Sequence, residues 1–217
     1  MDESTRTRLR EAAPYVVPFA VFAALTVGGP FAGIPPWFNY PLKTVLTAAA
    51  LVWYRRAYLE EIRPAFNIEA VLAGILVFGL WILLDGAYGY IGSSHFNPYE
   101  QASGGWVYPL IAFRLGGAAL VVPVMEELFW RSFALRFLIA SDFRSVPLGK
   151  FSWYSFILVS ILFGLEHHEW LSGILAGMIY AALLYRTKNL FDPILAHAVT
   201  NLLLGVYVLT TGSWSFW

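Results

Sequence analysis

The sequence predicts an all-α fold, a polytopic bundle of about seven transmembrane helices. Of its 217 residues, 59% are hydrophobic and 18% are aromatic, whereas only 13% are charged. Several apolar runs reach the roughly 20 residues that a helix needs to cross a hydrocarbon core of about 30 Å. Lys and Arg also recur in alternate loops, as they do in proteins that cross a bilayer repeatedly. We therefore expect an integral membrane protein whose first partner is the lipid bilayer.

The charge and cysteine content exclude several classes of function. The formal net charge is zero and there is no basic or acidic tail, so nothing points to a nucleic-acid partner. The chain has no cysteine, which excludes a thiol nucleophile, a disulfide framework and thiolate metal ligands.

Seven apolar segments, separated by polar or turn-forming loops, are the expected spans. The first contains two prolines and lacks a small-x-small cleavage site, which favours a retained helix over a signal peptide. The polar loop 86–105 is the longest connection. It predicts a division into N-terminal accessory transmembrane helices, residues 1–100, and a core, residues 101–217. The expected spans are residues 14–32, 35–54, 67–84, 107–138, 151–168, 171–186 and 190–210.

Basic residues predict the orientation of the chain. Arg residues precede the first span, and further Lys and Arg residues lie in the loops after the second, fourth and sixth spans. The intervening loops, around residues 30–40, 86–105 and 168–170, carry none. The positive-inside rule then places the N-terminus in the cytoplasm. Lys43 and Arg114 do not fit this count, and Arg114 is expected either to snorkel outward or to pair within the bundle.

The most informative stretch is VVPVMEELFWRSFALRF, residues 121–137, because it sets charged residues inside a long apolar segment. An ionisable side chain at the centre of a membrane helix costs roughly 2.5–3.5 kcal/mol on insertion scales and usually marks a function. In a helix, Glu127 and Arg131 stand four residues apart on one face and can pair. Glu126 points about 100° away from Glu127 and has no local partner. We expect a structural Glu127–Arg131 pair and a carboxylate at Glu126 that is free for chemistry.

Two later spans carry the remaining polar residues of the core. The fifth span ends in FGLEHHEW, with Phe163 and His167 four residues apart, and the seventh places His197 and Asn201 four apart on one face. Polar groups in lipid-embedded helices turn inward and satisfy one another. We therefore expect Glu126, His167, His197 and Asn201 to converge on one cavity.

These patterns resemble a known family. Glu-Glu-x-x-x-Arg (Glu126, Glu127, Arg131), Phe-x-x-x-His (Phe163, His167) and His-x-x-x-Asn (His197, Asn201) occur in this order on successive core helices. The ordered set is similar to that of the CAAX-protease and bacteriocin-processing family of intramembrane proteases. The resemblance covers about residues 107–205. The overall pattern is also similar to CAAX-protease-related bacterial proteins that accompany exosortase-type protein sorting.

The resemblance implies a glutamate-dependent intramembrane endopeptidase that acts on a membrane-associated protein or peptide, without a cofactor, in a bacterial inner membrane. By the family pattern Glu126 activates a water, His167 shares that water or the proton transfer, and His197 with Asn201 forms the oxyanion side. Glu127, Arg131 and Phe163 support the site. Independently of the family, a buried carboxylate is a competent general base near neutral pH, and an Asn amide is a good donor to developing negative charge. The Glu127–Arg131 pairing predicts that loss of Arg131 damages folding as well as activity.

Two other functions stay open at this point. Glu126, His167 and His197 are a plausible ligand set for zinc with water in the fourth position, although no His-Glu-x-x-His motif is present. Alternatively, the chain is a non-enzymatic membrane scaffold or binding protein, which would tolerate Glu126→Gln. A transporter would predict repeats and broken helices in both halves, and the sequence shows neither.

The helix ends pose a geometric problem for this convergence. In a helix that starts at Phe151, His167 lies about 24 Å along the axis, whereas His197 is only a turn past the start of its own span. We expect the fifth span to start well after Phe151. Glu166, His168 and Glu169 are expected at the membrane surface in contact with solvent. Gly173 and Gly177, in a Gly-x-x-x-Gly pattern, predict close helix packing.

Overall fold

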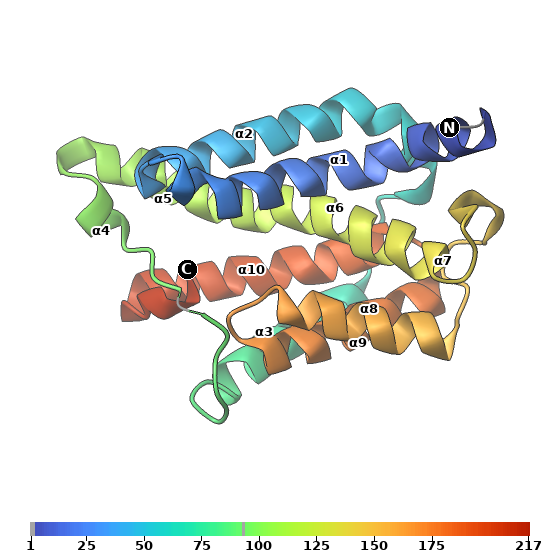
Figure 1. Ribbon diagram of the computed structural model, residues 1–217. Helices are drawn as coiled ribbons and strands as arrows, with labels where there is room; N and C mark the ends of the chain where they lie inside the picture. The colour runs from blue at the N-terminus through green and yellow to red at the C-terminus, as the bar shows by residue number, and fades with distance from the viewer. Residues whose placement is uncertain (1–2, 93) are drawn as a thin grey trace.

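The computed structural model describes residues 3–92 and 94–217, which form a single bundle of helices and contain no β-strand. In Figure 1, α10 lies between α1, α2 and the yellow-green helices on one side and α3, α8 and α9 on the other. The π-helical segments are Gly117–Val121 and Leu128–Ala134, and short 3-10 turns occupy Arg55–Ala57, Leu59–Glu61, Gly104–Trp106, Phe143–Ser145 and Trp214–Phe216. The α-helices are α1 (Glu3–Phe31), α2 (Pro36–Tyr54), α3 (Ile68–Leu83), α4 (Pro98–Gln101), α5 (Val107–Gly116), α6 (Val122–Glu127), α7 (Leu135–Phe137), α8 (Trp153–Leu165), α9 (Trp170–Thr187) and α10 (Phe191–Thr211).

The all-α prediction is confirmed, and helix occurs at each of the seven expected spans. Within the described part of the chain, three segments are long and apolar enough to cross a membrane: Thr5–Phe31, Gly104–Phe137 and Phe191–Thr211. Ile68–Leu83 and Trp153–Leu165 are apolar but shorter. The number of crossings therefore stays a prediction, as does the division of the chain near residue 100.

The surface of the bundle is apolar, as expected for a protein that faces lipid. Large side chains such as Phe31, Trp53, Leu83 and Tyr108 are more than 70% exposed. In water such a concentration of exposed apolar side chains would promote association, whereas lipid tails solvate it. The long apolar helices and this surface together identify a membrane protein.

The helix that carries Glu126 is not regular. Residues 107–137 run without interruption through α5, α6 and α7, but π-helical turns separate these three segments. Pro123 follows the first π-helical segment. Because proline has no N–H to donate to the preceding turn, the wider turn before it is a physically reasonable accommodation. π-helical turns inside α-helices occur frequently at functional sites.

Glycines allow the helices around the site to approach closely. A Cβ atom on Gly173 would lie 2.9 Å from Gly164 Cα, and one on Gly177 would lie 3.1 Å from Ser160 Cα. These contacts join α8 and α9, so the close packing predicted from the Gly-x-x-x-Gly pattern is present. On α3, a Cβ atom on Gly74 would collide with the Ala196 carbonyl oxygen of α10.

The α3–α10 contact gives a prediction with a matched control on the same helix. Gly74→Ala should destabilise the protein by about 1–3 kcal/mol, because the new methyl group forces α3 away from α10. Gly79→Ala meets open space, and it should stabilise the helix by about 0.5–1 kcal/mol, because alanine loses less backbone entropy than glycine. Thermal unfolding in detergent measures both variants. Equal transition temperatures would contradict the close contact.

Candidate active site

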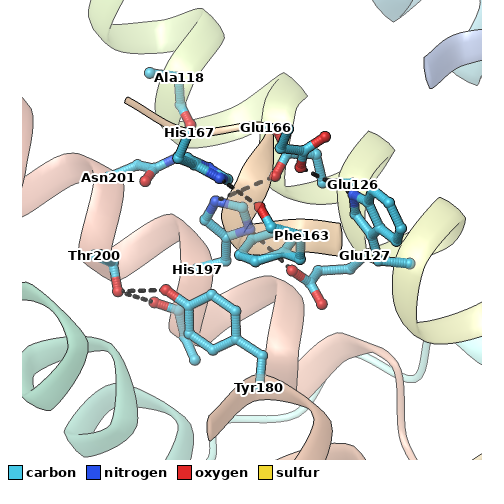
Figure 2. A network of polar contacts seen from close by, with 12 residues as sticks. Ala118, Glu126, Glu127, Phe163, Glu166, His167, Tyr180, His197, Thr200 and Asn201 are labelled. Atoms are coloured by element: carbon cyan, nitrogen blue, oxygen red, sulfur yellow. Dashed lines mark hydrogen bonds and ion pairs between the residues drawn. The ribbon is translucent and has the colours of Figure 1, made fainter. Parts of the chain in front are cut away.

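The predicted site residues surround one cavity of about 520 Å³ inside the bundle. Glu126 reaches it from α6, His167 from the turn between α8 and α9, and His197 and Asn201 from α10 (Figure 2). Side chains that are more than 70 positions apart in the sequence thus face one another. The expected convergence of these four residues is present.

Glu127, Arg131 and His197 form a buried polar chain behind the cavity. Arg131 Nε lies 3.0 Å from Glu127 Oε2, and both side chains are fully buried. The other carboxylate oxygen, Glu127 Oε1, lies 2.9 Å from His197 Nδ1. The Arg131 guanidinium rests on the Phe163 ring, 4.0 Å from its centroid, and lies 5.4 Å from that of Tyr180. The predicted ion pair is present, and the structure adds a contact from Glu127 to the imidazole of α10.

This chain sets the orientation of the His197 ring. A carboxylate oxygen accepts hydrogen bonds, so His197 Nδ1 donates to Glu127, and in the neutral imidazole Nε2 is then the acceptor nitrogen. Nε2 then faces Glu126, with 3.9 Å between it and Glu126 Oε2. The ring also stacks on Tyr180, whose hydroxyl donates to Thr200 Oγ1 at 2.7 Å. Glu127 is therefore an orienting residue for His197 as well as the partner of Arg131.

His167 lies just beyond the end of α8, where the chain turns back into α9. Its Nδ1 donates to the carbonyl oxygen of Phe163 at 2.7 Å, which leaves Nε2 as the acceptor nitrogen. The expectation that the fifth span starts well after Phe151 is wrong, since α8 starts at Trp153. The helix itself is short, at 13 residues, and His167 reaches the cavity from the turn that follows it.

Gly89 and Ile91, in the loop that follows α3, hold this turn in place. His168 Nδ1 donates to the Ile91 carbonyl oxygen at 2.8 Å, and the Ile91 N–H donates to the His168 carbonyl oxygen at 3.1 Å. Trp170 Nε1 donates to the Gly89 carbonyl oxygen at 2.8 Å. Because the turn carries His167, this loop contributes to the position of that imidazole.

Asn201 has one of its amide hydrogens engaged. Its Nδ2 donates to the Ala118 carbonyl oxygen at 2.8 Å, and Ala118 belongs to the first π-helical segment. An amide nitrogen carries two hydrogens, so one donor remains for a ligand in the cavity. The contact ties α10 to the irregular part of the helix that also carries Glu126.

Glu166 is exposed, as expected from the sequence, but it also lines the cavity, which the sequence did not predict. Its Oε1 accepts a hydrogen bond from Trp130 Nε1 at 2.9 Å, and the residue lines the cavity. Carboxylate oxygens of Glu126 and Glu166 and a ring nitrogen of His167 all lie within 4.8 Å of one another. The position of Glu166 directly before His167 was the available signal, but an acid after an apolar helix resembles a surface residue. Of the residues expected at the surface, Glu169 is the one for which the expectation is wrong, since it is only 6% exposed.

The same cluster is the part of the site that could hold a metal ion. Two carboxylates and one imidazole are a suitable donor set for a divalent cation. The set differs from the predicted one, because Glu166 takes the place of His197. His197 already directs its Nδ1 to Glu127, and its Nε2 lies opposite Glu126.

The fold and the site together define a class of protein: an all-helical membrane protein with carboxylates and imidazoles gathered around an internal cavity. The family model described as Rce1-like, type II CAAX prenyl endopeptidase, matches residues 108–203, so this part of the chain is similar to that family. The match confirms the resemblance drawn from the motifs and supports a CAAX-type intramembrane protease. It contains every predicted site residue. No curated protein and no solved structure matches the chain.

Proposed function

We propose that the protein is an intramembrane endopeptidase in which Glu126 activates a water for attack on a peptide carbonyl. The observation that carries the proposal is the approach of Glu126 Oε2 to His197 Nε2, 3.9 Å apart at the wall of the cavity. Glu126 Oε2 has no hydrogen-bond partner among the described residues, although it is buried. A buried acceptor without a partner favours a ligand that can donate to it, such as water.

The gap between these two atoms suits a single water molecule. A water oxygen about 2.8 Å from each atom spans a separation of 3.9 Å at an angle of about 90°. In this position the water donates one hydrogen to Glu126 and one to His197 Nε2, and its lone pair faces the cavity. Glu126 takes the proton as the oxygen bonds to the carbonyl carbon, and the proton passes to the amine when the C–N bond breaks.

The other residues position the reacting groups. Glu127 and Arg131 hold His197 with its Nε2 toward the water. The free amide hydrogen of Asn201 is the donor proposed for the oxyanion. His167, whose Nδ1 donates to the Phe163 carbonyl oxygen, shares the proton transfer with Glu126.

The proposed substrate is a membrane-associated protein or peptide that enters the cavity from the bilayer. The matched family is described by its action on CAAX prenyl proteins, so a farnesylated peptide ending in a CAAX sequence is the first probe, beside the same peptide without lipid. Purified protein in liposomes is incubated with each peptide, and the fragments are identified by mass spectrometry. Cleavage of either peptide supports the proposal. No cleavage of any membrane-anchored peptide in a broader library would contradict it.

We also propose that the N-terminus is cytoplasmic and that the protein resides in a bacterial inner membrane. The distribution of Lys and Arg supports this orientation. A reporter that is active only in the cytoplasm, fused to the N-terminus, tests this orientation. An inactive reporter on a stably expressed fusion would indicate the opposite orientation.

Metal removal separates the glutamate mechanism from the zinc alternative, which the Glu126, Glu166 and His167 cluster keeps open. Treatment with EDTA and phenanthroline is expected to leave the cleavage rate unchanged. In the proposed mechanism the base is a carboxylate, and the water that it activates is not coordinated to a metal ion. The measurement is the initial rate before and after chelation, with metal content determined in parallel. Loss of cleavage that returns when zinc is added would favour the metal-dependent mechanism instead.

A further inference from the structure

Two basic residues inside the bundle have no role in the chemistry proposed above. Lys43 of α2 and Arg114 of α5 both line the cavity that contains Glu126. They are also the two residues that did not fit the positive-inside pattern. A charged side chain within a membrane bundle is costly, and it usually faces an ionic partner or a ligand path.

Neither cation has an acidic partner among the described residues. Among residues 3–92 and 94–217, no carboxylate lies within ion-pair distance of Lys43 or Arg114. Lys43 Nζ donates to Thr26 Oγ1 at 2.9 Å, a neutral contact. Arg114 Nε is buried without a hydrogen-bond partner in the same part of the chain. Pairing of Arg114 within the bundle, one of the two expectations for this residue, is therefore not observed with any carboxylate among the described residues.

Aromatic rings contact both cations, and the two share one ring. The Tyr40 ring contacts both, with Lys43 Nζ 5.0 Å and the Arg114 Cζ atom 4.4 Å from its centroid. Phe96 and Trp217 also lie within 6 Å of the guanidinium. Cation–π contacts offset part of the desolvation cost, but they leave the mutual repulsion of two like charges in place. An anion between them would relieve that repulsion.

We propose that Lys43 and Arg114 form an anion-binding subsite that receives a carboxylate of the peptide substrate. The inference rests on the proposed peptidase function. The cavity is then basic at one end and acidic at the other, where Glu126 and Glu166 lie. Arg114 and Glu126 are twelve positions apart on one continuous helix, about 18 Å at 1.5 Å per residue. An extended peptide covers about 3.3 Å per residue, so the bound carboxylate lies within about five residues of the cleaved bond.

The test compares a peptide that ends in a free carboxylate with the same peptide ending in an amide. Wild type should bind and cleave the acid form with a KM about 10- to 100-fold lower, because a charge-assisted contact is lost in the amide. In Lys43→Gln and Arg114→Gln this preference should shrink, while kcat changes little. Arg114→Lys keeps the charge and should retain part of the preference even if Arg114→Gln folds poorly. Lys150→Gln, an exposed lysine outside the cavity, is the matched control.

Binding measured on the inactive Glu126→Gln variant keeps this test independent of catalysis. Suppose that the peptide with a free carboxylate binds more tightly than the amide, but wild type cleaves neither peptide. The anion-binding subsite is then supported and the proposed peptidase function is contradicted. If the Lys43 and Arg114 variants bind both peptides equally well and as tightly as wild type, the subsite is refuted. The same holds if those variants lose only bound phosphatidylglycerol in anionic vesicles, since the subsite would then bind a lipid phosphate.

Discussion

Glu126→Gln is expected to lower the rate of peptide cleavage by about 10²- to 10⁴-fold, the range over which a positioned general base contributes. The substitution keeps the size of the side chain and removes only its ability to take a proton. Because Glu126 is outside the Arg131 ion pair, the fold should persist. The measurement is the cleavage rate in liposomes, together with thermal unfolding of the same preparation.

A matched control separates loss of the base from a general effect of the substitution. Glu60 lies exposed in the connection between α2 and α3, outside the cavity, so Glu60→Gln should cleave like wild type. A folded Glu126→Gln protein with full activity would show that Glu126 is not the base. That result would favour the interpretation of the protein as a non-enzymatic scaffold, which predicts that Glu126→Gln is tolerated.

Arg131→Ala is expected to have the largest effect on stability, a loss of about 3–5 kcal/mol. The guanidinium is fully buried, and its removal leaves the Glu127 carboxylate without its cation. It also removes the group that lies over the Phe163 ring. Thermal unfolding in detergent measures the loss. Arg56→Ala, at an exposed arginine after α2, should change stability by no more than about 0.5 kcal/mol.

The double variant Glu127→Gln/Arg131→Met tests whether the cost comes from the unpaired charge. It should be more stable than Arg131→Ala, because neither buried charge remains. It should still cleave slowly, since His197 loses the ionised acceptor that fixes its ring. A double variant as unstable as Arg131→Ala would assign the effect to lost packing instead of charge.

Helical spacing alone was enough to predict part of the site. The Glu127–Arg131 pair follows from residues four apart on one helix, and its 3.0 Å contact is in the structure. The gathering of His167 and His197 near Glu126 followed from the scarcity of polar groups in apolar helices. Such local and compositional arguments need no knowledge of how the helices are arranged around one another.

Contacts between helices could not be predicted from the sequence. The bond from His197 to Glu127 depends on the height of α10 relative to α6, which no local pattern specifies. Glu166 is exposed as expected, but the sequence does not show that the turn after α8 lies against Trp130, so its place at the cavity was not predicted. The start of α8 was misplaced for the same reason. A charged residue next to a motif histidine is a signal worth weighing in such chains.

The central claim is that Glu126 activates water and forms no covalent bond with the substrate. The most direct test is cleavage in the presence of hydroxylamine, with the product mass determined by mass spectrometry. Direct attack by water predicts a new C-terminal carboxylate only, at any hydroxylamine concentration that leaves the enzyme folded. A hydroxamate product, or a covalent fragment on the protein, would show an acyl-enzyme intermediate and would contradict the account.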